Sequence, residues 1–179
     1  LTQVYGDRIT PPMLAGEGGY VRGEHDGHWW IPSGHIFYSP HVNDASAAEL
    51  AFARAHFFLP HRSRDPFGNT AFIRYDHYHF LPVHTTDALG NRALAEYDYR
   101  LLQPFRLTDA NGNRGEVAFD TLGMVAGTAV MGKVTETLGD SLAGFQPNLS
   151  EQQKDTFMSD PLASAPLLLG QATTRIVYD

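Results

Sequence analysis

The chain has 179 residues, enough to bury one hydrophobic core. Its formal net charge of −7 argues against nucleic-acid binding, which needs a basic surface, and its lack of cysteine excludes disulfides, thiol catalysis and cysteine-ligated zinc or iron–sulfur sites. The 17 glycines, 11 prolines and 12% aromatic residues favour strands joined by turns, so we predict a mainly β fold of antiparallel strands with one or two short helices.

Residues 1–44 are predicted to form a β-hairpin segment. The pair Asp26-Gly27 separates two short runs rich in aromatic and β-branched residues, 19–22 and 29–31, and this pattern is typical of a hairpin. A further strand is expected over 35–38.

Residues 45–56 are predicted to form a short helix. Ser46 and Glu49 have the spacing of a capping box, in which the two side chains accept hydrogen bonds from each other's backbone. The alanine-rich run that follows, to about Ala55, favours helix. The chain is expected to return to extended structure at 57–60.

Residues 57–131 contain a repeated phrase that predicts a sheet. The phrase starts at Asp65, Asp87 and Asp109, each 22 residues after the last, and ends at Tyr75-Asp76, Tyr97-Asp98 and Phe119-Asp120. A period of this size is typical of repeat architectures, in which each unit buries its apolar face against a copy of itself. Each repeat is predicted to supply two antiparallel strands.

The turn within each repeat has a defined chemistry. An aspartate followed three residues later by glycine fits a type I turn with a left-handed glycine, and therefore a hairpin with a bulge. After the turn, side chains alternate between an apolar face and a more polar one. The predicted apolar face consists of Ala71, Ile73, Tyr75, Ala93, Ala95, Tyr97, Gly115, Val117 and Phe119.

The return strand of each repeat also recurs. Pro60, Pro82 and Pro104 stand 22 residues apart, and each should mark a strand start, a bulge or an edge because proline donates no backbone hydrogen bond. At the second turn of each unit, His79 and Leu101 stand where Gly123 stands, so the first two repeats need not bend there.

Residues 132–179 are predicted to form a loop, a short helix and a terminal strand. Ser150 and Gln153 have capping-box spacing, so a helix should run to about Met158, and 173–178 alternate like a strand. The chain lacks an initial methionine and ends at Tyr178-Asp179, as each repeat does, so we expect a piece of a longer protein. Its unpaired apolar edge should make it associate.

These phrases resemble a known family. The Tyr-Asp endings, with residues 119–128, look like the tyrosine-aspartate (YD) repeats of the Rhs family. Together with the phrases at 29–34, 49–60 and 127–133, they resemble the middle region of the B component of bacterial insecticidal toxin complexes (Tc toxins) over most of residues 15–160.

The resemblance implies a secreted virulence protein whose YD repeats form a hollow β-shell, or cocoon. Such a shell encapsulates and protects a C-terminal toxic polypeptide before translocation. The implied partners are the rest of the shell, a C-component-like Rhs partner and the enclosed toxin, and a contact with a pore-forming A component is left open. No nucleic acid and no direct membrane insertion are implied. The chain shows nothing like the family's self-cleaving protease segment, so the function implied is structural and non-enzymatic.

A carbohydrate-binding or surface-adhesion β module is the alternative function. Trp29 and Trp30, with Phe37 and Tyr38, could offer aromatic rings to a sugar. Adjacent strand residues point to opposite faces, so one tryptophan is expected in the core and one exposed.

Metal binding is a third hypothesis, which we weigh against simpler structural roles. His77 and His79 would share a face of a strand, near His84, His61 and His56, but the aligned repeats do not repeat these histidines. The oxygens of Asp65, Asn69 and Asp76 could bind calcium, but a turn already uses such groups. We therefore assign no catalytic, cofactor-binding or metal-binding residue and expect no cofactor.

Overall fold

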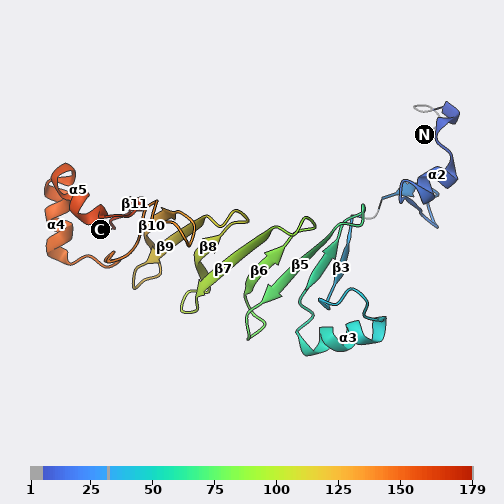
Figure 1. Cartoon of the computed structure of the whole chain (residues 1–179), viewed down its shortest axis with the longest axis horizontal. Helices are drawn as coiled ribbons and strands as arrows, with labels where there is room; N and C mark the ends of the chain where they lie inside the picture. The colour runs from blue at the N-terminus through green and yellow to red at the C-terminus, as the bar shows by residue number, and fades with distance from the viewer. Residues whose placement is uncertain (1–5, 32, 179) are drawn as a thin grey trace. The chain divides into compact units, whose positions relative to one another are not determined.

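The computed structural model describes residues 6–31 and 33–178 and is mainly β, as predicted (Figure 1). The chain forms two compact units, which are described separately. The first comprises Leu1–Arg74 with Thr86–Gly90, and the second comprises Tyr75–Thr85 with Asn91–Asp179.

The first unit contains a small hairpin and a three-stranded sheet. Its elements are η1 (Gly6–Arg8), α2 (Pro11–Gly16), β1 (Val21–Arg22), β2 (Trp29–Trp30), β3 (His35–Phe37), α3 (Ser46–Ala55), β4 (Arg62–Arg64) and β5 (Thr70–Tyr75). Strands β1 and β2 pair antiparallel, which confirms the hairpin predicted around Gly27. Strand β4 pairs antiparallel with β3 on one side and β5 on the other.

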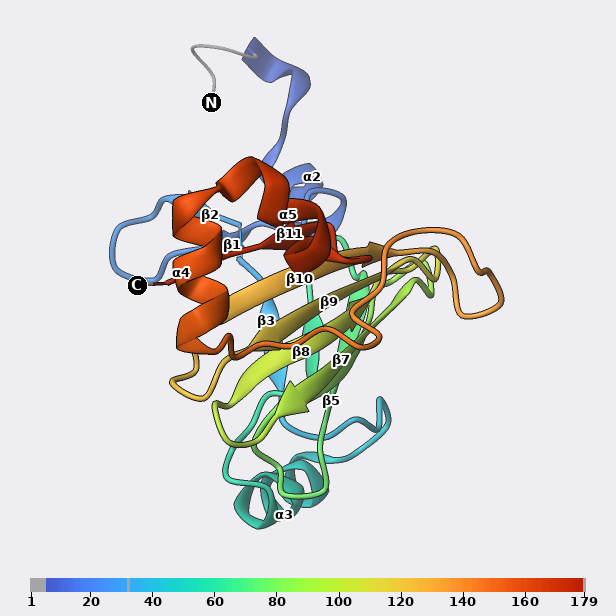
Figure 2. The same cartoon turned by 90° about the vertical axis from the view of Figure 1, so that its left-hand side faces the viewer.

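The second unit contains the longer run of strands. Its elements are β6 (Pro82–Thr86), β7 (Arg92–Asp98), β8 (Gln103–Thr108), β9 (Arg114–Phe119), β10 (Val125–Met131), α4 (Glu151–Ser159), α5 (Pro161–Leu169) and β11 (Thr174–Arg175). The strands neighbour one another in chain order, and the pairs from β7 to β11 are antiparallel. Figure 2 shows β7 to β10 side by side, with α4 and α5 beyond β10.

The prolines of the return strands lie where the sequence predicts. Pro82 is the first residue of β6 and Pro104 is the second residue of β8. The β7–β8 register shifts between Glu96 and Tyr97, so Tyr97 is the partner of Pro104 and the ladder contains a bulge at this point.

Of the two predicted capping boxes, one forms. At α4 the Ser150 hydroxyl accepts from the Gln153 backbone at 3.2 Å, and the Gln153 side chain accepts from the Ser150 backbone at 2.9 Å. At α3 the N-cap is Ala45 and no side chain caps the helix, so the predicted Ser46–Glu49 box is wrong. The Glu49 carboxylate instead accepts hydrogen bonds from the backbone of Tyr38 and Ser39.

The described residues contain four α-helices rather than one or two. Helices α2 and α5 were not predicted; both begin with proline at the first turn, and α5 is capped by the Asp160 carboxylate, which accepts from the Ala163 backbone at 3.1 Å.

The buried apolar core is small. The buried apolar side chains among the described residues are Leu14, Ala53, Ala126, Ala129 and Ala172, whereas many large apolar side chains are exposed. In the second unit, Phe145 covers the sheet at Gly127, where an added Cβ would lie 2.4 Å from the ring, and the Arg175 guanidinium lies 4.4 Å from the centre of that ring. Only a glycine lets Phe145 pack this closely.

Candidate functional site: turns and faces of the sheet

The turns at 65–69, 87–91 and 109–113, called here the first-edge turns, share one hydrogen-bond pattern. In the first, the Asp65 carboxylate accepts from the backbone of Phe67 and Asn69 at 2.9 Å and from the Asn69 side chain at 2.8 Å. Asp109 makes the equivalent contacts, and Gly68, Gly90 and Gly112 have φ of 89°, 86° and 84°. The predicted turn chemistry is confirmed.

This pattern leaves the turn carboxylates little capacity for a metal. The hydrogen bond from the Asn69 side chain lowers the pKa of Asp65, with further backbone donors adding to it, and Asn113 does the same for Asp109. Asp76, the third oxygen donor weighed for calcium, lies in a different turn. The structure therefore uses these aspartates to close hairpins.

The turns at 76–81, 98–102 and 120–124, called here the second-edge turns, also begin with aspartate. These aspartates are those of the repeated Tyr-Asp or Phe-Asp endings. The buried Asp76 carboxylate accepts from the backbone of Phe80 at 2.8 Å and Leu81 at 3.1 Å, and Asp120 accepts from Leu122 and Met124. The aspartate of each ending therefore starts the next turn.

The expectation that the first two repeats need not bend at this edge is wrong. His79 has a φ of 54° and Leu102 a φ of 58°, so non-glycine residues adopt the left-handed conformation that Gly123 adopts at 87° in the third repeat. Phe57 and Phe58, predicted as extended, also have positive φ. Contacts outside each turn hold these residues in a conformation that costs about 1–2 kcal/mol for an L-residue.

A pair of glycine substitutions should separate backbone strain from packing. Gly90→Ala should lower the free energy of unfolding by about 1 kcal/mol, because φ is positive although a Cβ there meets nothing within 4 Å. Gly123→Ala should cost about 2 kcal/mol, because its Cβ would also lie 2.6 Å from Leu101. Urea denaturation of both variants checks this, and equal costs would contradict the packing contribution.

Side chains join neighbouring second-edge turns. The Tyr99 hydroxyl donates to the Asp76 carboxylate at 2.6 Å, and this bond raises the pKa of Tyr99 to about 12. Arg100 donates to the carbonyls of Asp120 and Thr121, both at 3.0 Å, and Thr121 in turn donates to Asn148. The three turns are therefore linked in series.

The repeated tyrosine has a role that the sequence did not reveal. The Tyr97 hydroxyl donates to the Pro82 carbonyl and the Tyr178 hydroxyl to the Val125 carbonyl, both at 3.0 Å. The sequence predicted only packing on the apolar face. Recurrence of tyrosine rather than phenylalanine in two of the three repeats was the available signal.

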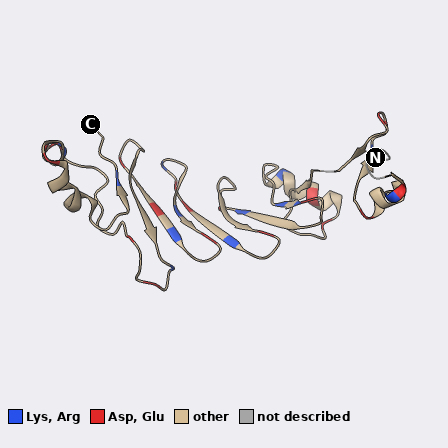
Figure 3. Cartoon of the chain, turned by 90° about the horizontal axis from the view of Figure 1, so that it is seen from above, with Lys and Arg blue, Asp and Glu red and all other residues tan. Residues whose placement is uncertain are grey.

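The two faces of the second unit's sheet differ in chemistry. Ala95, Leu107, Gly115 and Val130 are cross-strand neighbours on one face, and Leu107 and Val130 are 54% and 65% exposed. On the other face, the Arg106 guanidinium pairs with Glu96 at 2.8 Å and Glu116 at 2.5 Å. Figure 3 shows acidic and basic residues interspersed along the strands. The sheet thus has an uncovered apolar row, called here the apolar row.

A buried polar network holds the first unit together. Arg62 on β4 is 2% exposed; its Nε donates to the Ser39 carbonyl at 3.0 Å and its Nη2 lies 3.4 Å from Glu49. The guanidinium carbon lies 4.1 Å from the centre of the Phe37 ring, close enough for a cation–π interaction. This network joins α3, β4 and the loop after β3.

The histidines do not form the predicted strand pair. His77 and His79 lie in a second-edge turn, where His77 packs on Tyr78, and His56 stacks on Phe52 with ring centres 3.7 Å apart. Among residues 6–31 and 33–178, no group of three or more histidine, aspartate or glutamate side chains is placed to hold a metal ion. The premise that His77 and His79 share a strand face is wrong.

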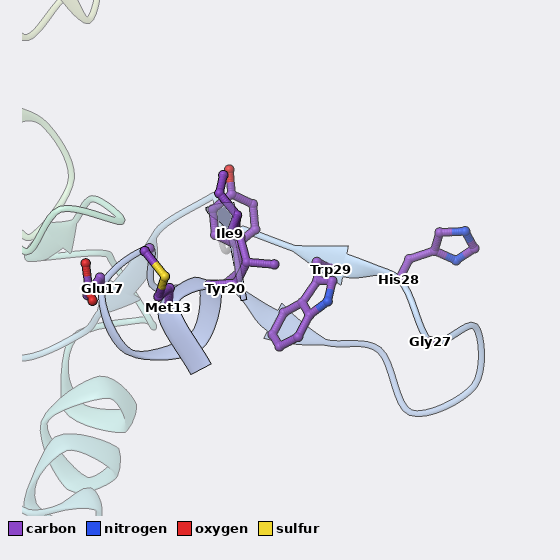
Figure 4. Close-up of a pocket in the computed structure, with 9 residues that line it drawn as sticks. Ile9, Met13, Glu17, Tyr20, Gly27, His28 and Trp29 are labelled. Carbon is purple, nitrogen blue, oxygen red and sulfur yellow. The ribbon is translucent and has the colours of Figure 1, made fainter. Parts of the chain in front are cut away.

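The two tryptophans lie beside a cavity of about 670 Å³ in the first unit (Figure 4). Trp29 lines the cavity with Ile9, Met13 and Tyr20, whereas Trp30 is exposed and its indole donates to Asp26 at 3.2 Å. Phe37 and Tyr38 pack elsewhere, against Arg62 and Phe58. The cavity is walled by α2, β1 and β2, and its lining is mostly apolar.

These features define a class of fold: an antiparallel sheet of repeated hairpins, each closed by aspartate and glycine. No protein-family model and no curated protein matches the chain. Among the described residues, none of the helices has both the length and the apolar character needed to cross a membrane.

Solved structures with a similar fold give the comparison its content. The crystal structure of TcdB2-TccC3 matches 84% of this chain with a TM-score of 0.60 and 22% identity. The structure of the Photorhabdus luminescens Tc holotoxin pore matches 98% of it with a TM-score of 0.60 and 19% identity. This chain spans only 7% and 10% of the length of those chains. The predicted resemblance to the YD-repeat region of Tc toxins is confirmed at the level of the fold.

Proposed function

We propose that this chain is a structural, non-enzymatic part of a toxin-complex or Rhs-type hollow β-shell that encloses a toxic polypeptide. The observation that carries this proposal is the apolar row, which contains the exposed Leu107 and Val130 side chains on one face of the sheet. An uncovered apolar row of this kind marks a surface that contacts another polypeptide.

The chemistry of the turns supports a structural role. The most regular polar groups of the chain are the turn aspartates, and their carboxylates accept backbone hydrogen bonds within their own hairpins. Their recurrence is accounted for by turn geometry, so no acid–base chemistry is needed to explain it.

The fold similarity supports the kind of assembly proposed. TcdB2-TccC3 and the Tc holotoxin pore contain a region with this fold. By analogy, the proposed partners are the rest of the same shell, a C-component-like Rhs protein and the enclosed polypeptide, and the proposed location is outside the producing cell.

Site-specific photo-crosslinking in the full-length protein tests this proposal. A photo-reactive amino acid at Leu107, in the apolar row, should crosslink to the enclosed polypeptide. The same amino acid at Leu94 should not, because Leu94 is also exposed but alternates to the opposite face. Crosslinks from position 94 and none from position 107 would contradict the proposal.

A further inference from the structure

The tips of several turns carry large apolar side chains that the turns do not require. Phe67 and Leu89 precede the glycine in two first-edge turns and are 83% and 88% exposed. The third first-edge turn has Asn111 at the same position and makes the same hydrogen bonds. Since asparagine satisfies the turn equally well, the exposed Phe67 and Leu89 side chains need another explanation.

The second-edge turns carry a comparable set. Leu122 stands at the same turn position as Phe67 and Leu89 and is 80% exposed, and Leu102 and Phe80 are also exposed. The Tyr99–Asp76 and Arg100–Asp120 bonds fix these turns relative to one another. The second edge is therefore a preorganised apolar surface, which binds at a lower entropic cost than a mobile one.

The two sets of tips have the same period. Each 22-residue unit contributes one turn to each edge, so successive tips are separated by two strands of the chain in both sets. Two strands correspond to roughly 9–10 Å across a sheet. Tips at the first edge of one copy therefore match the spacing of tips at the second edge of another copy.

We propose that the first-edge tips, Phe67 and Leu89, dock onto the second-edge tips, Leu102 and Leu122, of another copy of this chain. The contact is head-to-tail, because the surfaces that meet are different edges of the sheet. It concerns the edges and not the apolar row, so it does not depend on an enclosed polypeptide.

Sedimentation velocity on two paired variants of the chain tests this inference. The wild-type chain should self-associate with rising concentration. Phe67→Asn/Leu89→Asn removes the first-edge tips, and Leu102→Asn/Leu122→Asn removes the second-edge tips. Asparagine is tolerated at turn tips, as Asn111 shows, and at left-handed positions such as Leu102, so both variants should fold, which circular dichroism checks.

Each variant alone should associate at least tenfold more weakly than the wild type. An equimolar mixture should form a 1:1 complex that grows no further, because each partner retains one functional edge. A wild-type chain that stays monomeric, variants that associate like the wild type, or a mixture without a complex would each overturn the inference. Association that persists in both variants would instead point to pairing of exposed strand edges.

Discussion

Replacing Arg62 by alanine is expected to lower the free energy of unfolding by about 3–5 kcal/mol, the cost of breaking a buried ion pair. The guanidinium is 2% exposed and contacts the Ser39 carbonyl, the Glu49 carboxylate and the Phe37 ring. Its removal leaves a cavity and strands the carbonyl. Urea denaturation followed by circular dichroism measures the change.

Arg64 provides the matched control for this prediction. It lies on the same strand, is exposed, and its guanidinium carbon is 4.9 Å from the centre of the same Phe37 ring. Arg64→Ala should therefore cost less than about 1 kcal/mol. Arg62→Lys should fall between the two, because lysine cannot reproduce the fork of the guanidinium. Similar losses for Arg62→Ala and Arg64→Ala would show that the buried network does not stabilise the first unit.

Replacing Asp76 by alanine is expected to cost about 3 kcal/mol, because three donors lose a charged acceptor at once. These donors are the backbone groups of Phe80 and Leu81 and the Tyr99 hydroxyl. Tyr99→Phe, which removes only the bond between turns, should cost about 1 kcal/mol. If Tyr99→Phe cost as much as Asp76→Ala, the backbone bonds of the turn would contribute nothing.

The stability of the chain should also fall in acid, partly through Asp76. Burial raises the pKa of this carboxyl, but the Tyr99 hydroxyl and the backbone donors outweigh burial, so the pKa is lower than usual in the folded chain. The stabilisation from a group of this kind is present above its unfolded pKa of about 3.9 and is lost as the pH falls through the folded value. Asp76→Asn should flatten the dependence of unfolding free energy on pH below about 5. An unchanged acid slope would contradict this assignment.

The first-edge turns were predictable because their chemistry is local. Asp65 and Gly68 lie three residues apart, and every bond of the turn forms within five consecutive residues. The capping box of α4 was predictable for the same reason. The polarity of the two sheet faces also followed from alternation along single strands.

The second-edge turns and the α3 cap were mispredicted because distant residues determine them. His79 and Leu102 adopt left-handed conformations that their own side chains disfavour, in turns whose aspartates are bonded by groups outside the short motif. Glu49 had the spacing to cap its own helix, but the structure pairs it with Arg62, 13 residues away, and with the backbone after β3. Local spacing carries no information about such partners.

The candidate site was only partly accessible from sequence. The tyrosine-to-carbonyl bonds of Tyr97 and Tyr178 span 15 and 53 residues, so no local pattern predicts them. The exposure of Phe67 and Leu89 likewise depends on how much of each hairpin other residues cover. The aspartates looked like metal ligands in sequence because a turn and a calcium site use the same oxygen donors.

A cryo-electron microscopy map of the full-length protein tests the central claim most directly. The proposed shell predicts that β7 to β10 form part of a wall around a closed cavity, with the apolar row of Leu107 and Val130 facing density for an enclosed polypeptide. An interior filled by the protein's own side chains, with no cavity on that face, would contradict the proposal.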